Sequence, residues 1–159
     1  EKAIQHYKRA LNIAREMKAK GHEGINLGNL GHALYKLNCY EEAKQSLQQG
    51  IDICKSISHP AFSAFQGVLS LICAKESRFN EAFSLLEEAE PVIKEIPLEY
   101  GKFLCKKGEI LLLDGQQEKA KELVEKAQKI AEELKVRDTS ELAKEIQLLN
   151  EKILSNSNK

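Results

Sequence analysis

Two adjacent stretches decide the fold of this chain, LGNLGHALY at residues 27–35 and NCYEEA at residues 38–43. In the first stretch the leucines recur at intervals of three and four, which places apolar side chains on one face of an α-helix. The second stretch begins with Asn38, a residue type that is common at turns, and continues as a new helical pattern. Together they predict two helices joined by a tight turn.

The same spacing runs along the whole chain, and no segment alternates with a period of two for long enough to predict a strand. Helix-breaking residues occur at Gly21 to Gly24, at Asn38, at Ser58 to Pro60, at Ser77 to Phe79, near Pro97, at Asp114-Gly115 and near Asp138. We therefore expect about seven helices separated by short turns.

A signature of small and acidic residues recurs four times. The alanines that mark it are Ala3, Ala43, Ala82 and Ala120, which stand 40, 39 and 38 residues apart. Other small residues recur seven residues after each alanine and twelve residues before the last three, at Ala10, Gly50, Ala89 and Ala127 and at Gly31, Ser70 and Gly108. Since side chains this small let antiparallel helices approach closely, the recurrence predicts a repeat protein with fixed helix crossing points.

This pattern resembles the tetratricopeptide repeat, most clearly in LGNLGHALY and in the YEEA start of the next helix. The spacing exceeds the family's usual repeat of about 34 residues. It is similar to that of the lengthened subclass in kinesin light chains, cell-polarity adaptors and bacterial peptide-sensing regulators. The resemblance implies an all-α, right-handed solenoid of antiparallel helix pairs, in which longer second helices, at residues 1–20 and 116–135 for example, absorb the extra residues.

The resemblance implies one domain over residues 1–159. Its expected parts are the second helix of a truncated repeat at 1–20, repeats at 23–57, 61–95 and 98–135, and a C-terminal capping helix at 139–154. Two positions depart from the family pattern, because Gln66 and Lys107 stand where apolar residues are usual. Pro91 lies inside an expected helix, where it removes a backbone donor and should kink or shorten that helix.

One helix face carries polar residues that could bind a ligand. If the leucines of residues 27–34 pack against the partner helix, Asn29, His32 and Lys36 share another face. In the family this face lines the concave groove, and an Asn placed like Asn29 commonly hydrogen-bonds the backbone of a bound peptide. An amide suits that role because it offers both donors and an acceptor. The alternatives are that Asn29 faces water or caps a local carbonyl, and that His32 is only its solvated neighbour.

A second polar face lies in the 98–135 segment. There Lys102 and Lys106 resemble two basic positions of the carboxylate clamp of chaperone-binding repeats, with an acid three residues further on. The intervening repeat presents Ala64, Val68 and Leu71 where the clamp needs polar groups, which argues against a chaperone-tail function. The predicted groove residues, around this apolar floor, are Asn29, His32, Lys36, Lys102, Lys106 and Glu109.

Composition excludes several other classes. Lys plus Arg is 24 and Asp plus Glu is 24, so the chain lacks the basic excess of a nucleic-acid binder. No apolar run approaches the roughly 18 residues that span a bilayer, and the N-terminal residues show no signal-peptide pattern, so we expect a cytoplasmic protein without a membrane partner. The histidines lack metal-ligand spacing and no phosphate loop is present, so we expect no metal, cofactor or catalytic site. The four cysteines form no C-x-x-C pair and should be buried free thiols.

These patterns predict a non-enzymatic interaction module that binds a peptide or protein segment in its concave groove, as a scaffold or regulatory part of a larger protein. The alternative is a ligand- or peptide-sensing arm of a bacterial signalling protein or transcription regulator. The chain begins without Met inside an amphipathic pattern, so we expect it to be a piece of a longer protein. We also expect self-association through the uncovered apolar face of helix 1–20.

Overall fold

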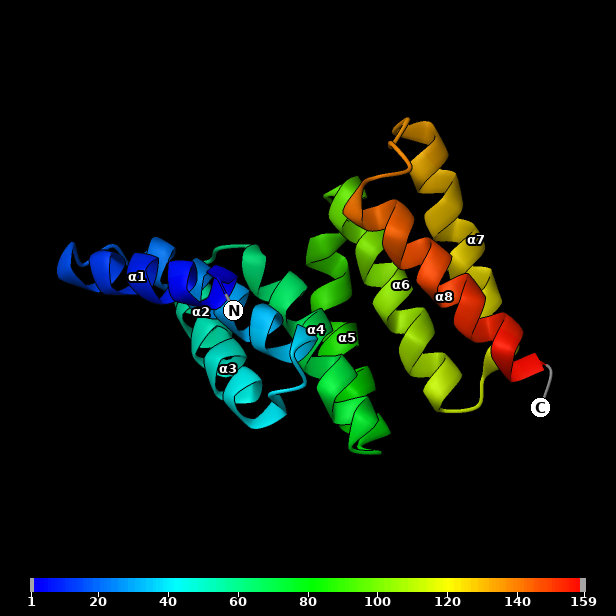
Figure 1. Cartoon of the computed structure of the whole chain (residues 1–159), viewed down its shortest axis with the longest axis horizontal. Helices are drawn as coiled ribbons and strands as arrows, with labels where there is room; N and C mark the ends of the chain where they lie inside the picture. The colour runs from blue at the N-terminus through cyan, green and yellow to red at the C-terminus, as the bar shows by residue number, and fades with distance from the viewer. Residues whose placement is uncertain (1, 158–159) are drawn as a thin grey trace.

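The computed structural model describes residues 2–157, and all regular structure in this range is helical. The eight helices are α1 (Lys2–Glu16), α2 (Lys20–Lys36), α3 (Tyr40–Ser56), α4 (Ala61–Lys75), α5 (Phe79–Ile93), α6 (Pro97–Leu113), α7 (Gln117–Glu133) and α8 (Glu141–Ser157). They stack along one long axis, with α1 near one end and α7 and α8 at the other (Figure 1). The predicted all-α solenoid is confirmed, with one helix more than the breakers indicated.

The helices form two layers. The closest pairs are α2 with α3, α4 with α5 and α6 with α7. The first helices of these pairs also contact one another in series, α2 with α4 and α4 with α6, and α8 continues the series against α6. The second helices α3, α5 and α7 make no such contacts within residues 2–157. The layer of α2, α4, α6 and α8 is therefore the tighter, concave side of the solenoid.

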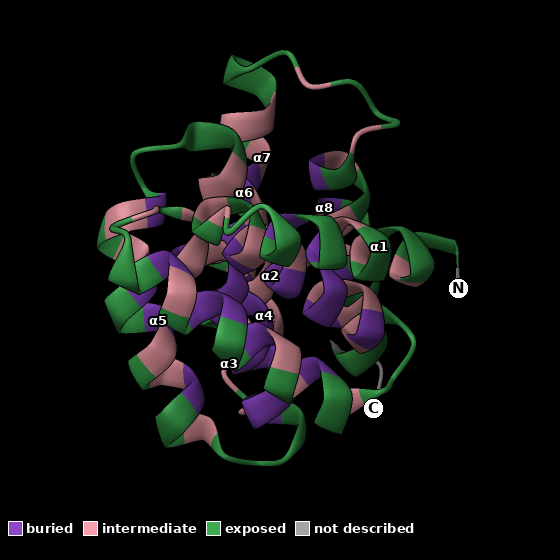
Figure 2. Ribbon diagram, turned by 90° about the vertical axis from the view of Figure 1, so that its left-hand side faces the viewer, coloured by how far each residue is buried: buried purple, intermediate pink, exposed green. Residues whose placement is uncertain are grey.

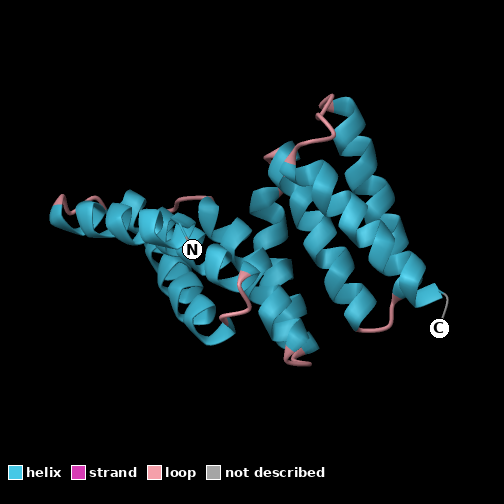
Figure 3. Cartoon of the chain, in the orientation of Figure 1, coloured by secondary structure: helices cyan, strands magenta, loops and turns pink. Residues whose placement is uncertain are grey.

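Most turns repeat one backbone conformation, and Figure 3 shows how short the loops are, apart from that between α7 and α8. Two residues after the helix end, the backbone is left-handed, with φ between 51° and 77°; these positions are Lys18, Asn38, Ser58, Ser77, Gly115 and Lys135. The next amide donates to a carbonyl five residues back, as Cys39 does to Leu34 at 3.0 Å. This is the Schellman cap, which satisfies the last carbonyls of each helix. The α5–α6 turn differs, because Ile96 is extended and Pro97 begins α6.

The helix break expected at Gly21 to Gly24 is wrong, because both glycines lie inside α2 and the turn comes earlier, at Lys18. Packing explains the second glycine. A Cβ at Gly24 would lie 2.9 Å from side-chain atoms of Ile53 and Cys54 on α3. This glycine therefore permits a close helix contact and does not end a helix.

The expectation that longer second helices absorb the extra residues is also wrong. The helices at 1–20 and 116–135 extend only over Lys2–Glu16 and Gln117–Glu133, and helices of both layers contain 15 or 17 residues. The extra residues are thus shared between the two layers. Pro91 lies inside α5, which ends two residues later, at Ile93, and contains 15 residues, as α1 and α4 do.

The recurring small residues of the last three segments lie where helices cross, whereas Ala3 is exposed and Ala10 is only half-buried. Ala43, Ala82, Ala89, Ala120 and Ala127 are fully buried. Larger apolar residues around them form three clusters that follow one another along the solenoid, and buried positions mark the faces where helices meet in Figure 2. The core is therefore a series of interfaces between neighbouring helices, as in other repeat proteins.

Two side chains depart from the predicted burial. Cys39 is exposed in the α2–α3 turn, whereas the other three thiols are buried. Gln66, at a position that is usually apolar, is 1% exposed, and its amide nitrogen donates to a Glu88 carboxylate oxygen at 2.6 Å. Its Oε1 atom has no hydrogen-bond partner among the described residues. Within residues 2–157, no helix is both long enough and apolar enough to cross a membrane.

Candidate functional site

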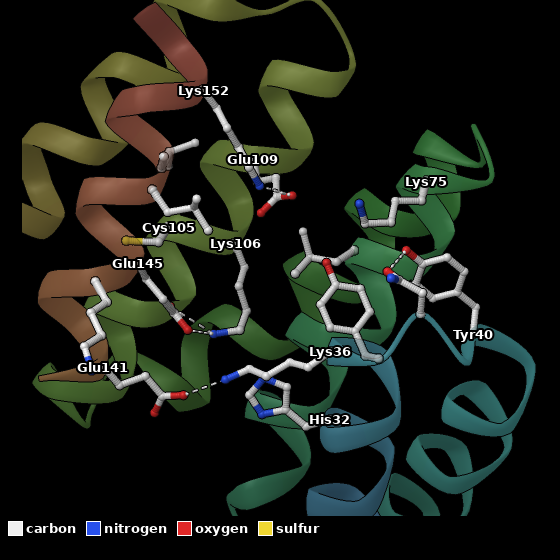
Figure 4. Close-up of a pocket in the computed structure, with 16 residues that line it drawn as sticks. His32, Lys36, Tyr40, Lys75, Cys105, Lys106, Glu109, Glu141, Glu145 and Lys152 are labelled. Carbon is white, nitrogen blue, oxygen red and sulfur yellow. Dashed lines mark hydrogen bonds and ion pairs between the residues drawn. The ribbon is translucent and has the colours of Figure 1, made fainter. Parts of the chain in front are cut away.

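The concave layer carries two adjoining pockets. The first has a volume of about 590 Å³ and lies among α2, α4, α6 and α8; the second, of about 440 Å³, lies beside it, where α1 also contributes. Four side chains belong to both, His32, Lys36, Lys106 and Glu141. The two pockets thus form one continuous groove, and Figure 4 shows its first part.

The structure brings all six sequence-predicted residues to this groove. Asn29 and Lys102 line the second pocket and Glu109 lines the first, and the remaining three line both. The two helical faces converge because α2 and α6 both pack against α4. The apolar floor is also present, with Ala64 and Val68 in the second pocket and Leu71 in the first.

Asn29 lies half-buried on the groove face of α2, and its amide makes no hydrogen bond to the described residues. Asn26, by contrast, caps a local carbonyl by donating to His22 O at 2.8 Å. The interpretation of Asn29 as such a cap is therefore wrong. Its donors and acceptor face the groove without an internal partner.

His32 is half-buried at the junction of the two pockets. Burial lowers the pKa of its imidazole to about 4, and the positive charges of Lys36 and Lys106 contribute in the same direction. At neutral pH the ring is therefore uncharged. It can donate one hydrogen bond and accept another.

Helix α8 supplies carboxylates to the groove, which the sequence analysis missed. Glu141 bridges the two repeats, with one oxygen 3.3 Å from Lys36 Nζ on α2 and the other 3.4 Å from Lys102 Nζ on α6. Glu145 lies 3.4 Å from Lys106 Nζ (Figure 4). Since residues 141 and 145 are one helical turn apart, their spacing could have identified a shared acidic face on the capping helix.

A third contact ties α8 to α6, because Lys152 Nζ lies 2.7 Å from a Glu109 carboxylate oxygen. The predicted acid Glu109 thus has a partner already. Lys102 is likewise 2.7 Å from Glu99 on its own helix. The groove is therefore lined by lysines and glutamates that form ion pairs with one another, around an apolar floor.

Aromatic and aliphatic side chains line the first pocket as well. Tyr35 pairs with Tyr40 at a ring separation of 5.9 Å, and the Tyr40 hydroxyl donates to Asn38 at 2.8 Å. Leu148 of α8 borders the pocket and remains 51% exposed. Its exposure leaves apolar surface that an incoming side chain could cover.

Cys105 also lines the first pocket, but burial raises the pKa of its thiol to about 12. Because thiolates are the reactive form, this cysteine is a poor nucleophile at neutral pH. Within residues 2–157, no three His, Cys, Asp or Glu side chains converge as a metal site requires. The groove offers hydrogen bonds, ion pairs and apolar contacts.

Comparison with known proteins identifies part of this architecture. The profile of the family described as tetratricopeptide repeat matches residues 26–56 and 101–134. These segments correspond to most of α2–α3 and α6–α7, on either side of the groove. No curated protein matches the chain significantly. Tetratricopeptide repeats are generally protein-interaction modules and typically not enzymes. Residues 26–56 and 101–134 are therefore similar to tetratricopeptide repeats, and they lie in a solenoid of helix pairs.

Proposed function

We propose that this chain binds a peptide or protein segment in its concave groove, as a scaffold or regulatory part of a larger protein. One observation carries the proposal: six polar residues from two separate helices meet in one groove. They are Asn29, His32, Lys36, Lys102, Lys106 and Glu109. The spacing of 38 to 40 residues between the marker alanines also supports assignment to the lengthened subclass of the family.

The chemistry of the groove suits a polypeptide ligand. The Asn29 amide has no partner among the described residues and offers donors and an acceptor to a main chain. Leu148 and the floor at Val68 and Leu71 offer apolar contacts to side chains. Because these groups sit on packed helices, little ordering of the protein is needed on binding.

A peptide-display selection tests the proposal. The probe is a library of random 16-residue peptides, selected on the purified chain. Binders are then measured on a groove variant, Asn29→Ala with Leu148→Ser, which changes both pockets without changing charge. The matched control, Asn80→Ala with Leu154→Ser, makes the same substitutions at exposed positions that line neither pocket.

We expect binders that lose at least tenfold in affinity on the groove variant and keep their affinity on the control. Unchanged circular dichroism and melting temperature establish that both variants fold. A selection that gives no binders, or only binders that both variants retain, would overturn the proposal.

A second candidate is a sensing arm, which one contact favours. The Lys36–Glu141 ion pair joins residues 105 positions apart, and both line the groove. A ligand that separates them would change how α2 and α8 are placed. Small-angle scattering with a saturating groove-dependent peptide distinguishes the roles: a sensor changes its radius of gyration, and a static scaffold does not.

A further inference from the structure

We infer that the groove selects an acidic segment, one whose contacting face carries carboxylates around at least one large apolar side chain. The inference rests on the proposed function and specifies its partner. It begins with charge. Six lysines and four glutamates line the two pockets, in a chain whose total charge is zero. The groove therefore has a local positive excess.

Two of these lysines account for the excess. Lys75 on α4 and Lys144 on α8 both border the first pocket and are exposed. Neither forms an ion pair with any described residue. Lys75 extends from the wall opposite α8, beside Tyr40 (Figure 4). A ligand that crosses the pocket would thus meet an uncompensated ammonium group on each wall.

The other four lysines already pair with carboxylates inside the groove. Helix α8 presents Glu141 to Lys36 and Lys102, and Glu145 to Lys106, at 3.3 to 3.4 Å. Ion pairs elsewhere in the groove are shorter, such as the 2.7 Å between Lys152 and Glu109. These longer contacts leave the ammonium groups of Lys36 and Lys106 able to engage a further carboxylate, whereas Lys102 also lies 2.7 Å from Glu99. The capping helix thus behaves as an internal acidic ligand that an incoming segment would partly replace.

The apolar requirement comes from the space between the charges. The first pocket, of about 590 Å³, is bordered by Tyr35, Leu71 and the half-exposed Leu148. Pockets that bind ligands usually have volumes of about 300–1,000 Å³, so this pocket is large enough to enclose an apolar side chain of the bound segment. A basic segment that placed an apolar side chain there would also bring its cations against Lys75 and Lys144. An acidic segment satisfies both the charge and the apolar surface.

The display selection tests this inference separately from the proposed function. The readout is the net charge of those peptides that lose binding on the charge-neutral groove variant. We expect these peptides to be enriched in Asp and Glu over the unselected library. Groove-dependent binders of neutral or basic average charge would overturn the acidic preference and leave the proposed function standing. If no groove-dependent binder appears, both fail.

One synthetic peptide from the acidic set, labelled for fluorescence anisotropy at 0.15 M salt, then tests the named lysines. Lys75→Gln with Lys144→Gln should weaken binding about fivefold, since exposed charge contacts contribute modestly. The control, Lys126→Gln with Lys129→Gln, removes the same charge from the exposed face of α7 and should change nothing. Equal affinity of the two double variants would overturn the assignment.

Removing the charge of Glu141 tests the inference in the opposite direction, because here the affinity for the acidic peptide should rise. Glu141→Gln should tighten binding of the acidic peptide two- to fivefold, because it removes the competing charge at Lys36 and Lys102. Glu125→Gln makes the same change at an exposed position of α7 outside both pockets. Weaker binding by the Glu141 variant, or equal tightening by both variants, would contradict competition by the capping helix.

Discussion

Acidification should destabilise the fold through one imidazole, that of His32 on the groove face of α2. Burial is the largest cause of its lowered pKa, since a charged ring would lose hydration there. The ammonium groups of Lys36, Lys106 and Lys102 act in the same direction, and the Glu141 carboxylate opposes them. The ring is therefore held neutral by the elements that form the groove.

The magnitude follows from the two protonation equilibria. The imidazole pKa is 6.5 in the unfolded reference and about 4 in the fold. Because the folded state favours the neutral ring, this contribution to stability is complete above about pH 6.5 and is lost as the pH falls toward 4. A separation of about 2.5 pH units, at 1.36 kcal/mol per unit, corresponds to about 3 kcal/mol.

Urea unfolding followed by circular dichroism at 222 nm measures this effect. The unfolding free energies of the wild-type chain and of His32→Gln are compared at pH values between 7.5 and 4. Both chains contain the same carboxylates, so the effect of carboxylate protonation cancels in the difference between the two free energies. We expect the wild type to lose about 3 kcal/mol more than the variant over this range. The control His22→Gln changes an exposed imidazole on the same helix. Parallel pH profiles for wild type and His32→Gln would refute the reasoning.

Three further outcomes test the packing and the surface. Gln66→Met should raise the unfolding free energy by about 1 kcal/mol, because it removes a buried carbonyl oxygen without a partner among the described residues, while the half-exposed Glu88 carboxylate that loses the amide donor keeps Lys55 and water; an unchanged urea midpoint would contradict this. Gly50→Ala should lower it by about 3 kcal/mol, because the new Cβ would lie 2.7 Å from the backbone nitrogen of Gly28; a melting temperature equal to that of the wild type would show that the helices can separate. Finally, we propose self-association through the end of α1, where Ile13 and the next turn residue Met17 are 56% and 73% exposed. Light scattering at high concentration should show pairing that Ile13→Lys with Met17→Lys abolishes, and a monomeric wild type would count against it.

Local patterns predict most of the fold because each solenoid helix buries one face against its neighbours. The spacing of leucines identified the buried face of α2, and the recurring small residues identified the crossings at Ala43, Ala82 and Ala120. The pattern misled at Gly24, where a glycine permits helix contact. A glycine that relieves a clash and one that ends a helix look alike until the neighbouring helix is known.

The groove was predictable in part for the same reason. Asn29, His32 and Lys36 share a face through helical geometry alone, and so do Lys102 and Lys106. The contributions of α8 were not predictable in this way. Whether its carboxylates reach the lysines of α2 depends on how far the stack of repeats curves.

By itself, therefore, the sequence determined most of the helices, their pairing and the polar faces of α2 and α6, because these follow from periods of three to four and of about forty residues. Only the tertiary structure decided that Glu141 meets Lys36 across 105 positions, and that Lys75 and Lys144 remain unpaired among the described residues. The physical reason is that small rotations between successive helix pairs add along the solenoid. Their sum sets which distant side chains lie within the few ångströms over which an ion pair forms.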